Sequence, residues 1–248
     1  MSWGCIDMHE ILGVIPAKGY SARIPGKNLI DLGGKPLLQW TIEAARTSVL
    51  SRIIVSTDDA EISTYAAGFG IEVMQRYSPL AAPLVHAVHV VLDVLQQCYV
   101  ANEYVPDAVM MLLPTSPFRT ADHIDDAIAL WSAKTCEAVI GVKQLPHHLI
   151  NERTINEAGC LRPITQAPLD VNQQELEPLY AVTGAIFLAA ERVLLRDRSF
   201  HRSDWAIPYV MNGLSCLEID TPADLETARR LCRHQSHPPP ISPEVLYA

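Results

Sequence analysis

The sequence predicts an α/β protein built on a three-layer, doubly wound and mostly parallel sheet. Short apolar or β-branched runs alternate along the chain with segments whose apolar residues recur at helical spacing. One run, Ala108–Leu113 (AVMMLL), is apolar without alternation, which is typical of a central parallel strand covered on both faces. With 248 residues, 49% of them hydrophobic, the chain can bury one full core. We therefore expect one domain with an excursion.

The first half of the chain contains most of this alternation. The expected strands are Ile11–Ile15, Arg52–Ser56, Ile71–Met74, Ala108–Leu113 and Ala138–Val142. The expected helices begin near Pro36, at Asp58 or Asp59 (ending by Gly68), around Leu84 and at Asp122 (ending near Ala133). A turn is expected at Gly33 and Gly34, before the first helix.

The second half is less regular. Residues 144–178 lack long apolar periods, and loops of this length are usually functional or interfacial. After them we expect a strand at Gly184–Ala189, a short helix at Glu191–Arg196, a last strand at Ser215–Asp220 and a helix opened by a capping box at Thr221–Asp224. The domain is expected to span 11–233, with 144–178 as an inserted segment, 1–10 as a loose leader and 234–248 as a mobile tail.

Composition narrows the classes of partner. A net charge of -9 and a pI near 5.4 argue against nucleic acid or an anionic membrane. The chain has no N-terminal charged-then-apolar signal and no apolar run of ~18 residues, so we expect a cytoplasmic protein. The six cysteines show no metal-binding spacing and are expected to be reduced core thiols. His86 and His89 are spaced for a metal, but no third ligand is evident, so they stay outside the predicted site.

The most informative stretch is Ile11–Asn28, ILGVIPAKGYSARIPGKN, a short strand followed by a loop with three cations. Lys18, Arg23 and Lys27, together with backbone N–H groups, could surround a polyphosphate. The alternative is a solvated basic turn. The rigid Pro25-Gly26 pair beside Lys27 favours the functional interpretation, because a merely solvated loop does not need a fixed backbone.

Two familiar phosphate loops are excluded. A Walker loop reads G-x-x-x-x-G-K-[ST], but Gly19 and Gly26 stand too far apart and Asn28 replaces the magnesium-binding hydroxyl. The dinucleotide fingerprint G-x-G-x-x-G is absent too. A phosphate site here would therefore be of another kind.

Several polar segments follow predicted strands, where ligands gather in an open parallel sheet. One is the loop that carries Lys18, Arg23 and Lys27, called the basic loop below. The others are Thr57-Asp58, Arg76, Pro114–Arg119 and Lys143. Each alone could be an ordinary strand-end loop, and helix capping explains Asp58 well. Their convergence predicts a site at this edge of the sheet.

Two carboxylates belong to the same prediction. Glu218 and Asp220 alternate on the predicted last strand, so both point to one face, ~6.5 Å apart. Magnesium takes one or two carboxylates together with phosphate oxygens, and this pair is a candidate for holding Mg²⁺ against a triphosphate. The alternative is a solvent-facing strand end.

The chain resembles the bacterial CMP-sugar synthetases, and among them the N-acylneuraminate cytidylyltransferases. The resemblance covers roughly Leu12 to Cys232. Its segments occur in the family's order: IPA…S…IPGKN, VSTDD, R-x-x-x-LA, PTSPFR, P-x-Y…GA-I-F and EIDTPADLE. The loop pattern Ser21-x-Arg23-x-Pro25-Gly26-Lys27 also matches the sister branch that activates 3-deoxy-manno-octulosonate.

The resemblance implies a nucleotide-diphospho-sugar transferase-like fold and a magnesium-dependent transfer of CMP from CTP to the anomeric hydroxyl of a nonulosonic-type acid. It also implies a homodimer formed through 144–178. Carried over by position, the implied catalytic residues are Lys27, Arg23 and Asp220, and the implied magnesium ligands are Glu218 and Asp220. The implied nucleotide-binding residues are Ala17, Lys18, Ser21, Asn28 and Arg76. The implied sugar-binding residues are Thr115, Ser116, Lys143, Tyr180, Thr183 and Gly184.

Departures from the family pattern concentrate on the sugar side. Leu113 stands where sialate enzymes have glutamine, Thr183 replaces an asparagine, and Asn172-Gln173 replaces two arginines. On the nucleotide side, Lys18 replaces the usual arginine, Ala22 removes a lysine and Glu218 replaces an aspartate, which keeps most of the charge. We therefore expect an intact nucleotide end and a sugar other than ordinary sialic acid. The alternatives are a 3-deoxy-manno-octulosonate cytidylyltransferase, a nucleotidyltransferase for another base, and a catalytically silent sugar-nucleotide-binding protein.

Overall fold

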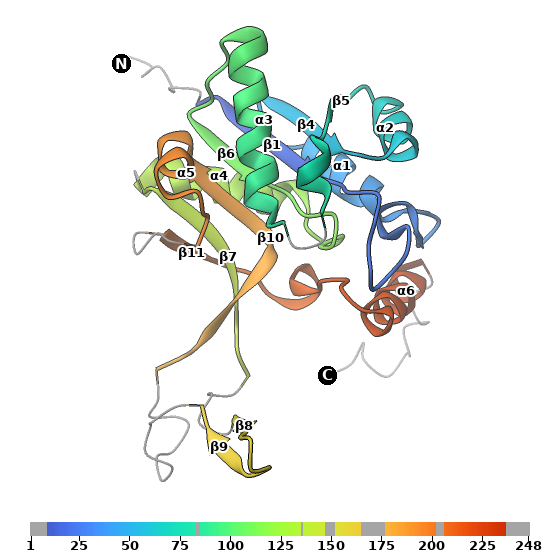
Figure 1. Cartoon of the computed structure of the whole chain (residues 1–248), viewed down its shortest axis with the longest axis vertical. Coiled ribbons are helices and arrows are strands. Elements are labelled where there is room, and N and C mark those ends of the chain that lie inside the picture. The colour runs from blue at the N-terminus through green and yellow to red at the C-terminus, as the bar shows by residue number, and fades with distance from the viewer. Residues whose placement is uncertain are drawn as a thin grey trace, which may run out of the picture.

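A seven-stranded sheet forms the centre of the molecule (Figure 1). The computed structural model describes residues 9–82, 85–134, 136–146, 152–164, 177–201 and 206–236. In spatial order the strands are β11 (Ala206–Val210), β7 (Ala138–Gln144), β10 (Tyr180–Ala190), β6 (Ala108–Met111), β1 (Ile11–Pro16), β4 (Arg52–Thr57) and β5 (Glu72–Gln75). Only β10 runs antiparallel to its neighbours in this sheet. The predicted α/β fold with a mostly parallel sheet is confirmed.

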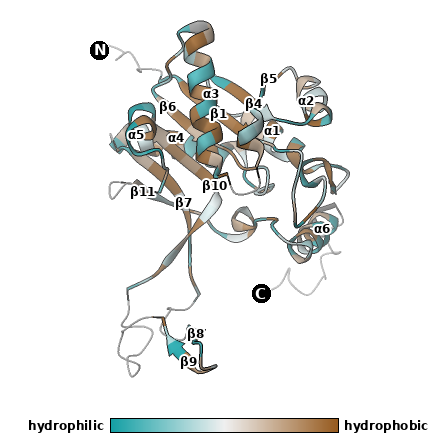
Figure 2. Ribbon diagram, viewed as in Figure 1, coloured by the Kyte–Doolittle hydropathy of each residue, from teal (hydrophilic) through white to brown (hydrophobic). Residues whose placement is uncertain are grey.

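Helices cover both faces of the sheet. They are α1 (Leu37–Arg46), α2 (Ala60–Ala67), α3 (Ala87–Asn102), α4 (Ala121–Lys134), α5 (Glu191–Asp197) and α6 (Pro222–Ser236). In β1, Ile11 and Ile15 pack with α1, α2 and α4, whereas Leu12 and Val14 pack with α3 on the other face. Figure 2 shows the apolar residues concentrated in the central strands. This is the three-layer arrangement that the sequence predicts.

A smaller cluster attaches α6 to the segment after β1. Ile24, Leu37 and Ile219 are buried there with residues of α6. The hairpin β2 (Asp31–Leu32) and β3 (Lys35–Pro36) lies beside them, and its turn is the predicted Gly33-Gly34 pair, both with positive φ. This cluster brings the end of the chain against the basic loop.

The predicted last strand, Ser215–Asp220, is wrong. A 3₁₀ turn at Gly213–Cys216 is followed by an extended segment outside the sheet. The edge next to β7 is already occupied by β11, a strand that the sequence analysis missed because Pro208 interrupts its pattern. Proline is tolerated in edge strands. Instead of joining a ladder, Ile219 donates one backbone hydrogen bond to the Thr115 carbonyl, at 2.8 Å.

Other boundaries differ by small amounts. β10 begins at Tyr180 rather than Gly184 and changes register between Val182 and Phe187. Leu84, expected in the third helix, lies outside the described residues, and α3 begins at Ala87.

The excursion leaves the body as a ribbon formed by β7 and β10, with the hairpin β8 (Arg153–Ile155) and β9 (Leu161–Pro163) at its far end (Figure 1). Residues 147–151 and 165–176, including Asn172 and Gln173, lie outside the described ranges. At the other end of the chain, α6 runs to Ser236, past the expected domain end at 233.

The cysteines fit their prediction in part. Cys98 and Cys232 are buried, and Cys136 and Cys216 are half-buried, but Cys160 is exposed on the β8–β9 hairpin and is not a core thiol. All five are free thiols, whereas Cys5 is not described. Within the described ranges, none of the helices has both the length and the apolar character needed to cross a membrane.

Candidate active site

A cavity of about 560 Å³ opens at the carboxyl ends of the central strands. The loop after β1, the residue after β5, the loop after β6, the middle of β10 and the segment before α6 all contribute to its lining. The predicted site residues that line it are Lys18, Ser21, Arg23, Lys27, Asn28, Arg76, Thr115, Thr183, Gly184, Glu218 and Asp220. The chain therefore brings eleven of the predicted residues around one space.

Two hydrogen bonds hold the basic loop in place. The Asn28 amide donates to the Lys18 carbonyl at 2.8 Å, and the Gly19 N–H donates to an Asp58 oxygen at 3.1 Å. A Cβ on Gly19 would lie 2.6 Å from an Asp59 oxygen, so only glycine allows this close approach. Asp59 caps α2, and Asp58, which the sequence analysis explained by capping, holds the loop instead.

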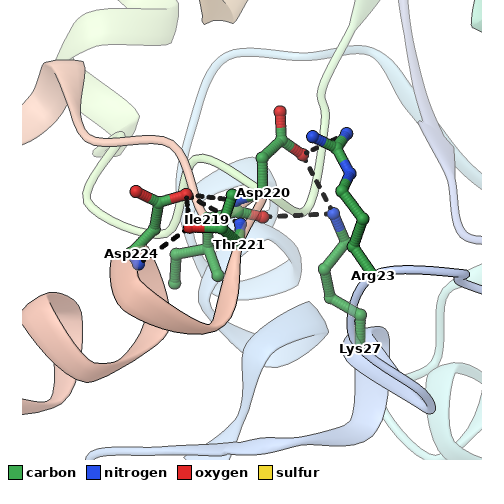
Figure 3. A network of polar contacts seen from close by, with 6 residues as sticks. All are labelled: Arg23, Lys27, Ile219, Asp220, Thr221 and Asp224. Carbon is green, nitrogen blue, oxygen red and sulfur yellow. Dashed lines mark hydrogen bonds and ion pairs between the residues drawn. The ribbon is translucent and has the colours of Figure 1, made fainter.

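Lys27 and Arg23 converge on one carboxylate (Figure 3). The Lys27 ammonium lies 3.2 Å from Asp220 Oδ1 and donates to the Ile219 carbonyl at 3.1 Å. The Arg23 guanidinium is 3.5 Å from the same Asp220 oxygen. The Lys27 side chain is only 14% exposed and that of Arg23 64%, so the Lys27 pair is less screened by water. Lys27 is thus a positioned charge at the cavity wall.

Hydrogen bonds to the first turn of α6 hold the backbone of Asp220 in place. One Asp224 oxygen accepts from the Asp220 N–H (3.1 Å), the Thr221 N–H (2.7 Å) and the Thr221 hydroxyl (2.8 Å), and the Thr221 hydroxyl accepts from the Asp224 N–H (Figure 3). This is the predicted capping box, with Pro222 as the first helical residue. The cap fixes the point at which the Asp220 side chain leaves the backbone.

Glu218 sits against Gly184 of β10. Its carboxylate accepts the Gly184 N–H, and a Cβ on Gly184 would lie 1.9 Å from Glu218 Oε1, which explains glycine at this position. Burial raises the pKa of Glu218, and the Asp220 charge raises it further, while the Gly184 N–H, Lys143 and Lys27 oppose the shift. Although their segment is not a strand, Glu218 and Asp220 still line the same cavity.

Arg76 lies at the other end of the cavity. Its side chain is buried and donates to the Ser56 carbonyl at 2.8 Å, while its Nε is buried without a partner. Burial lowers its pKa, and the charges of Asp58 and Asp93 oppose the shift. Arg76 thus places a weakly compensated cation beside the cavity.

Four predicted residues do not line this cavity. Ala17 is fully buried, with its N–H bonded to the Ser56 carbonyl, and Ser116 is buried within the loop after β6. Lys143 lines a neighbouring cavity of about 340 Å³ with Asn212 and Cys216. Tyr180 is exposed on the ribbon.

Sequence reasoning missed one exposed aromatic and an apolar wall. Tyr20, at the tip of the basic loop, lines the cavity and was passed over as a loop residue. Ala87 and Val90 at the start of α3, with Val182 and Phe187 of β10, line its other side. The sequence does not single out these four residues, because a cavity wall and a core face have the same apolar signal.

Comparisons with known proteins show related sequences and a related fold. Residues 12–144 match the family model described as Cytidylyltransferase. A CMP-N,N'-diacetyllegionaminic acid synthase of Legionella pneumophila is 34% identical over 226 residues, which are 90% of this chain and 96% of that protein. An N-acylneuraminate cytidylyltransferase of Streptococcus agalactiae is 30% identical over 214 residues, 85% of this chain and 50% of that protein. In fold, the chain is similar to a CMP:2-keto-3-deoxy-manno-octonic acid synthetase solved with CTP, with a TM-score of 0.68, 18% identity and coverage of 91% and 99%.

Proposed function

Because the chain belongs to the cytidylyltransferase family, as a nucleotidyltransferase of the CMP-sugar synthetase type, we propose that it transfers CMP from CTP to a nonulosonic-type sugar acid. The observation that carries the proposal is the cluster of Lys27, Arg23 and two carboxylates at the wall of one cavity. The legionaminic acid and N-acylneuraminate relatives favour an acceptor of this class.

In this reaction the anomeric oxygen forms a bond to the α-phosphorus of CTP, the bond to pyrophosphate breaks, and the hydroxyl proton is released. Phosphoryl transfer of this kind depends mainly on positioning and charge neutralisation. Lys27, fixed by the Ile219 carbonyl and Asp220, would meet a phosphate with little reorganisation. Arg23 would add a planar donor set from the same loop. A covalent enzyme intermediate is not needed.

Glu218 and Asp220 are suited to hold Mg²⁺. Both are carboxylates, both line the cavity next to the cations that would meet the phosphates, and magnesium usually takes one or two carboxylates with phosphate oxygens. When bound, the ion supplies positive charge against the phosphate oxygens. Asp220 would then be shared between the ion and Lys27, while the Gly184 N–H keeps Glu218 in place.

We assign the remaining predicted residues to the nucleotide or to the acceptor from their places around the two cavities. Lys18 and Ser21 would bind phosphate from the basic loop, and Arg76 with Asn28 would lie toward the base. Thr115, Thr183 and Gly184 line the same cavity, and we propose that they contact the acceptor. Lys143 could reach the acceptor from the neighbouring cavity, since its charge acts on Glu218.

Pyrophosphate release tests the proposal. The protein would be incubated with Mg²⁺, one of CTP, UTP, ATP or GTP, and a panel of 2-ulosonic acids. We expect release only with CTP together with a nonulosonic acid. If CTP supports pyrophosphate release with 3-deoxy-manno-octulosonate but with no nonulosonic acid, the acceptor is 3-deoxy-manno-octulosonate. Faster release with another nucleotide would reject CTP as the donor. Binding of CTP without any pyrophosphate release would indicate a catalytically silent binding protein.

A further inference from the structure

The end of β4 lies between the basic loop and Arg76. In the sheet, β4 pairs with β1 on one side and with β5 on the other (Figure 1). The basic loop follows β1, Arg76 follows β5, and both line the cavity. The residues that end β4 are therefore placed to hold both groups.

Two backbone carbonyls at the end of β4 make these contacts. The Ser56 carbonyl accepts the N–H of Ala17, the residue before Lys18, at 2.9 Å. The same carbonyl accepts an N–H of the Arg76 guanidinium at 2.8 Å. The Thr57 carbonyl accepts the Arg76 backbone N–H, also at 2.8 Å. The start of the basic loop and the Arg76 side chain are thus tied to one backbone group.

Asp58 adds a charge to these contacts. One of its carboxylate oxygens accepts the Gly19 N–H at 3.1 Å, so this N–H of the basic loop is bonded to protein. Burial lowers the pKa of Arg76, and the charges of Asp58 and Asp93 oppose this shift. Asp58 is not among the described residues that line the cavity. It therefore acts on a ligand only through the loop and Arg76.

The charge of Asp58 has a cost, because it repels the phosphates that the cations of the loop would bind. Capping does not explain this charge, since Asp59 is the residue that caps α2. The bond to the Gly19 N–H does not explain it either, because a neutral asparagine also offers an oxygen there. Arg76 does explain it. This residue is only 4% exposed, and a buried cation needs a compensating charge.

We propose that Asp58 is a positioning residue that aligns the basic loop with Arg76, so that one nucleotide engages both. Its hydrogen bond fixes the loop, and its charge keeps the Arg76 guanidinium at the cavity. This inference rests on the proposed function, in which the loop binds the phosphates of CTP and Arg76 lies toward the base. Cytosine presents two neighbouring acceptors, O2 and N3, to a guanidinium, whereas uracil carries a hydrogen on N3.

Two variants separate the two roles of the carboxylate. Asp58→Asn keeps an oxygen for the Gly19 N–H and removes the charge, whereas Asp58→Ala removes both. Dissociation constants are measured by calorimetry on the full protein with Mg²⁺ for CTP, UTP and inorganic tripolyphosphate. The ratio of the UTP and CTP constants reports on the base end, and tripolyphosphate reports on the loop alone.

We expect Asp58→Asn to bind tripolyphosphate at least as tightly as the parent, because a repelling charge is gone, and to lose about tenfold of the preference for CTP over UTP. Asp58→Ala should lose this preference and also bind tripolyphosphate about tenfold more weakly, the usual size of one hydrogen bond to a charged group. Asp125→Ala is the matched control. It removes a carboxylate that accepts the Val49 N–H at 2.9 Å away from the cavity, and it should leave all three constants unchanged.

Either of two results would overturn the inference, even if pyrophosphate release shows that the proposed function is right. If Asp58→Asn keeps the full preference for CTP, the charge does not position Arg76. If Asp58→Ala keeps the affinity for tripolyphosphate, the hydrogen bond does not position the loop. If the variants behave as expected but no sugar acid supports pyrophosphate release, the inference stands and the proposed transfer reaction fails.

Discussion

At the residue scale, Lys27 has the clearest role. Its ammonium is partly buried and held by the Ile219 carbonyl and Asp220 at the wall of the cavity. Lys27→Ala should lower kcat by about 10²–10³, the usual cost of losing one preorganised charge. The measurement is steady-state pyrophosphate release with saturating CTP.

Lys35→Ala is the matched control, because Lys35 also pairs with a carboxylate, Glu43, but does not line the cavity. This variant should keep turnover close to that of the parent. If Lys27→Ala does so too, Lys27 has no part in catalysis.

The two carboxylates lead to a prediction about metal dependence. Asp220→Asn should abolish magnesium-dependent turnover, and Glu218→Gln should raise the magnesium concentration needed for half-maximal rate, because each removes the charge of a proposed ligand. Titration of activity with Mg²⁺ measures both effects. Glu226→Gln, an exposed carboxylate on α6 outside the cavity, is the control. Unchanged magnesium titrations of both cavity variants would place the metal elsewhere.

At the element scale, Arg119 joins three parts of the fold. It is 1% exposed and donates to the Leu113 carbonyl after β6 (3.3 Å), the Ala185 carbonyl of β10 (3.0 Å) and the Thr41 hydroxyl of α1 (2.9 Å). Burial without a facing carboxylate lowers its pKa. Its bonds join the segment after β6 to β10 at Ala185, the residue next to Gly184.

Arg119→Met should therefore destabilise the protein by about 2–4 kcal/mol, because it leaves buried acceptors without their donor. Urea unfolding followed by circular dichroism measures the change. Arg192→Met, an exposed arginine at the start of α5, should stay within about 0.5 kcal/mol. Equal midpoints for the two variants would contradict this role of Arg119.

The elements differ in how well the sequence predicts them. β1 and β6 are covered by helices on both faces, so their unbroken apolar runs identify them. The β11 edge strand was missed because Pro208 weakens its pattern. Leu217 and Ile219 look like strand residues because they alternate, yet they pack against α6 in an extended segment. A short apolar alternation does not show whether an edge is free to pair.

The charged residues of the site were predictable from the sequence, whereas some of its contacts were not. Cations and carboxylates such as Lys27, Arg23 and Asp220 were identifiable because strand ends of a parallel sheet meet at one edge. The contact between Glu218 and Gly184 could not be predicted, because it depends on a close approach between segments 34 positions apart in sequence. The apolar wall also needed the structure, which shows that Val182 and Phe187 face a cavity.

At the scale of the whole molecule, the ribbon of β7 and β10 extends away from the body (Figure 1). Its hairpin exposes Ile155 and Leu161 away from the body (Figure 1). We propose that 144–178 packs against the same segment of a second copy, since a two-fold pair would cover such side chains in both copies at once.

Sedimentation of the full chain and of a variant with 146–167 replaced by a short Gly/Ser linker tests this proposal. We expect a dimeric parent and a monomeric variant that still binds CTP. A monomeric parent, or a variant that remains dimeric, would remove this segment from the interface.

The central claim is that a sugar hydroxyl attacks the α-phosphorus of CTP in the cavity between the basic loop and Asp220. Its most direct test follows isotopic label from CTP carrying ³²P at the α or the γ position, with Mg²⁺ and a nonulosonic acid. We expect α-label to appear in a CMP-sugar and γ-label in pyrophosphate. Release of γ-label as free phosphate, or α-label recovered only in unchanged CTP or in CDP, would contradict it.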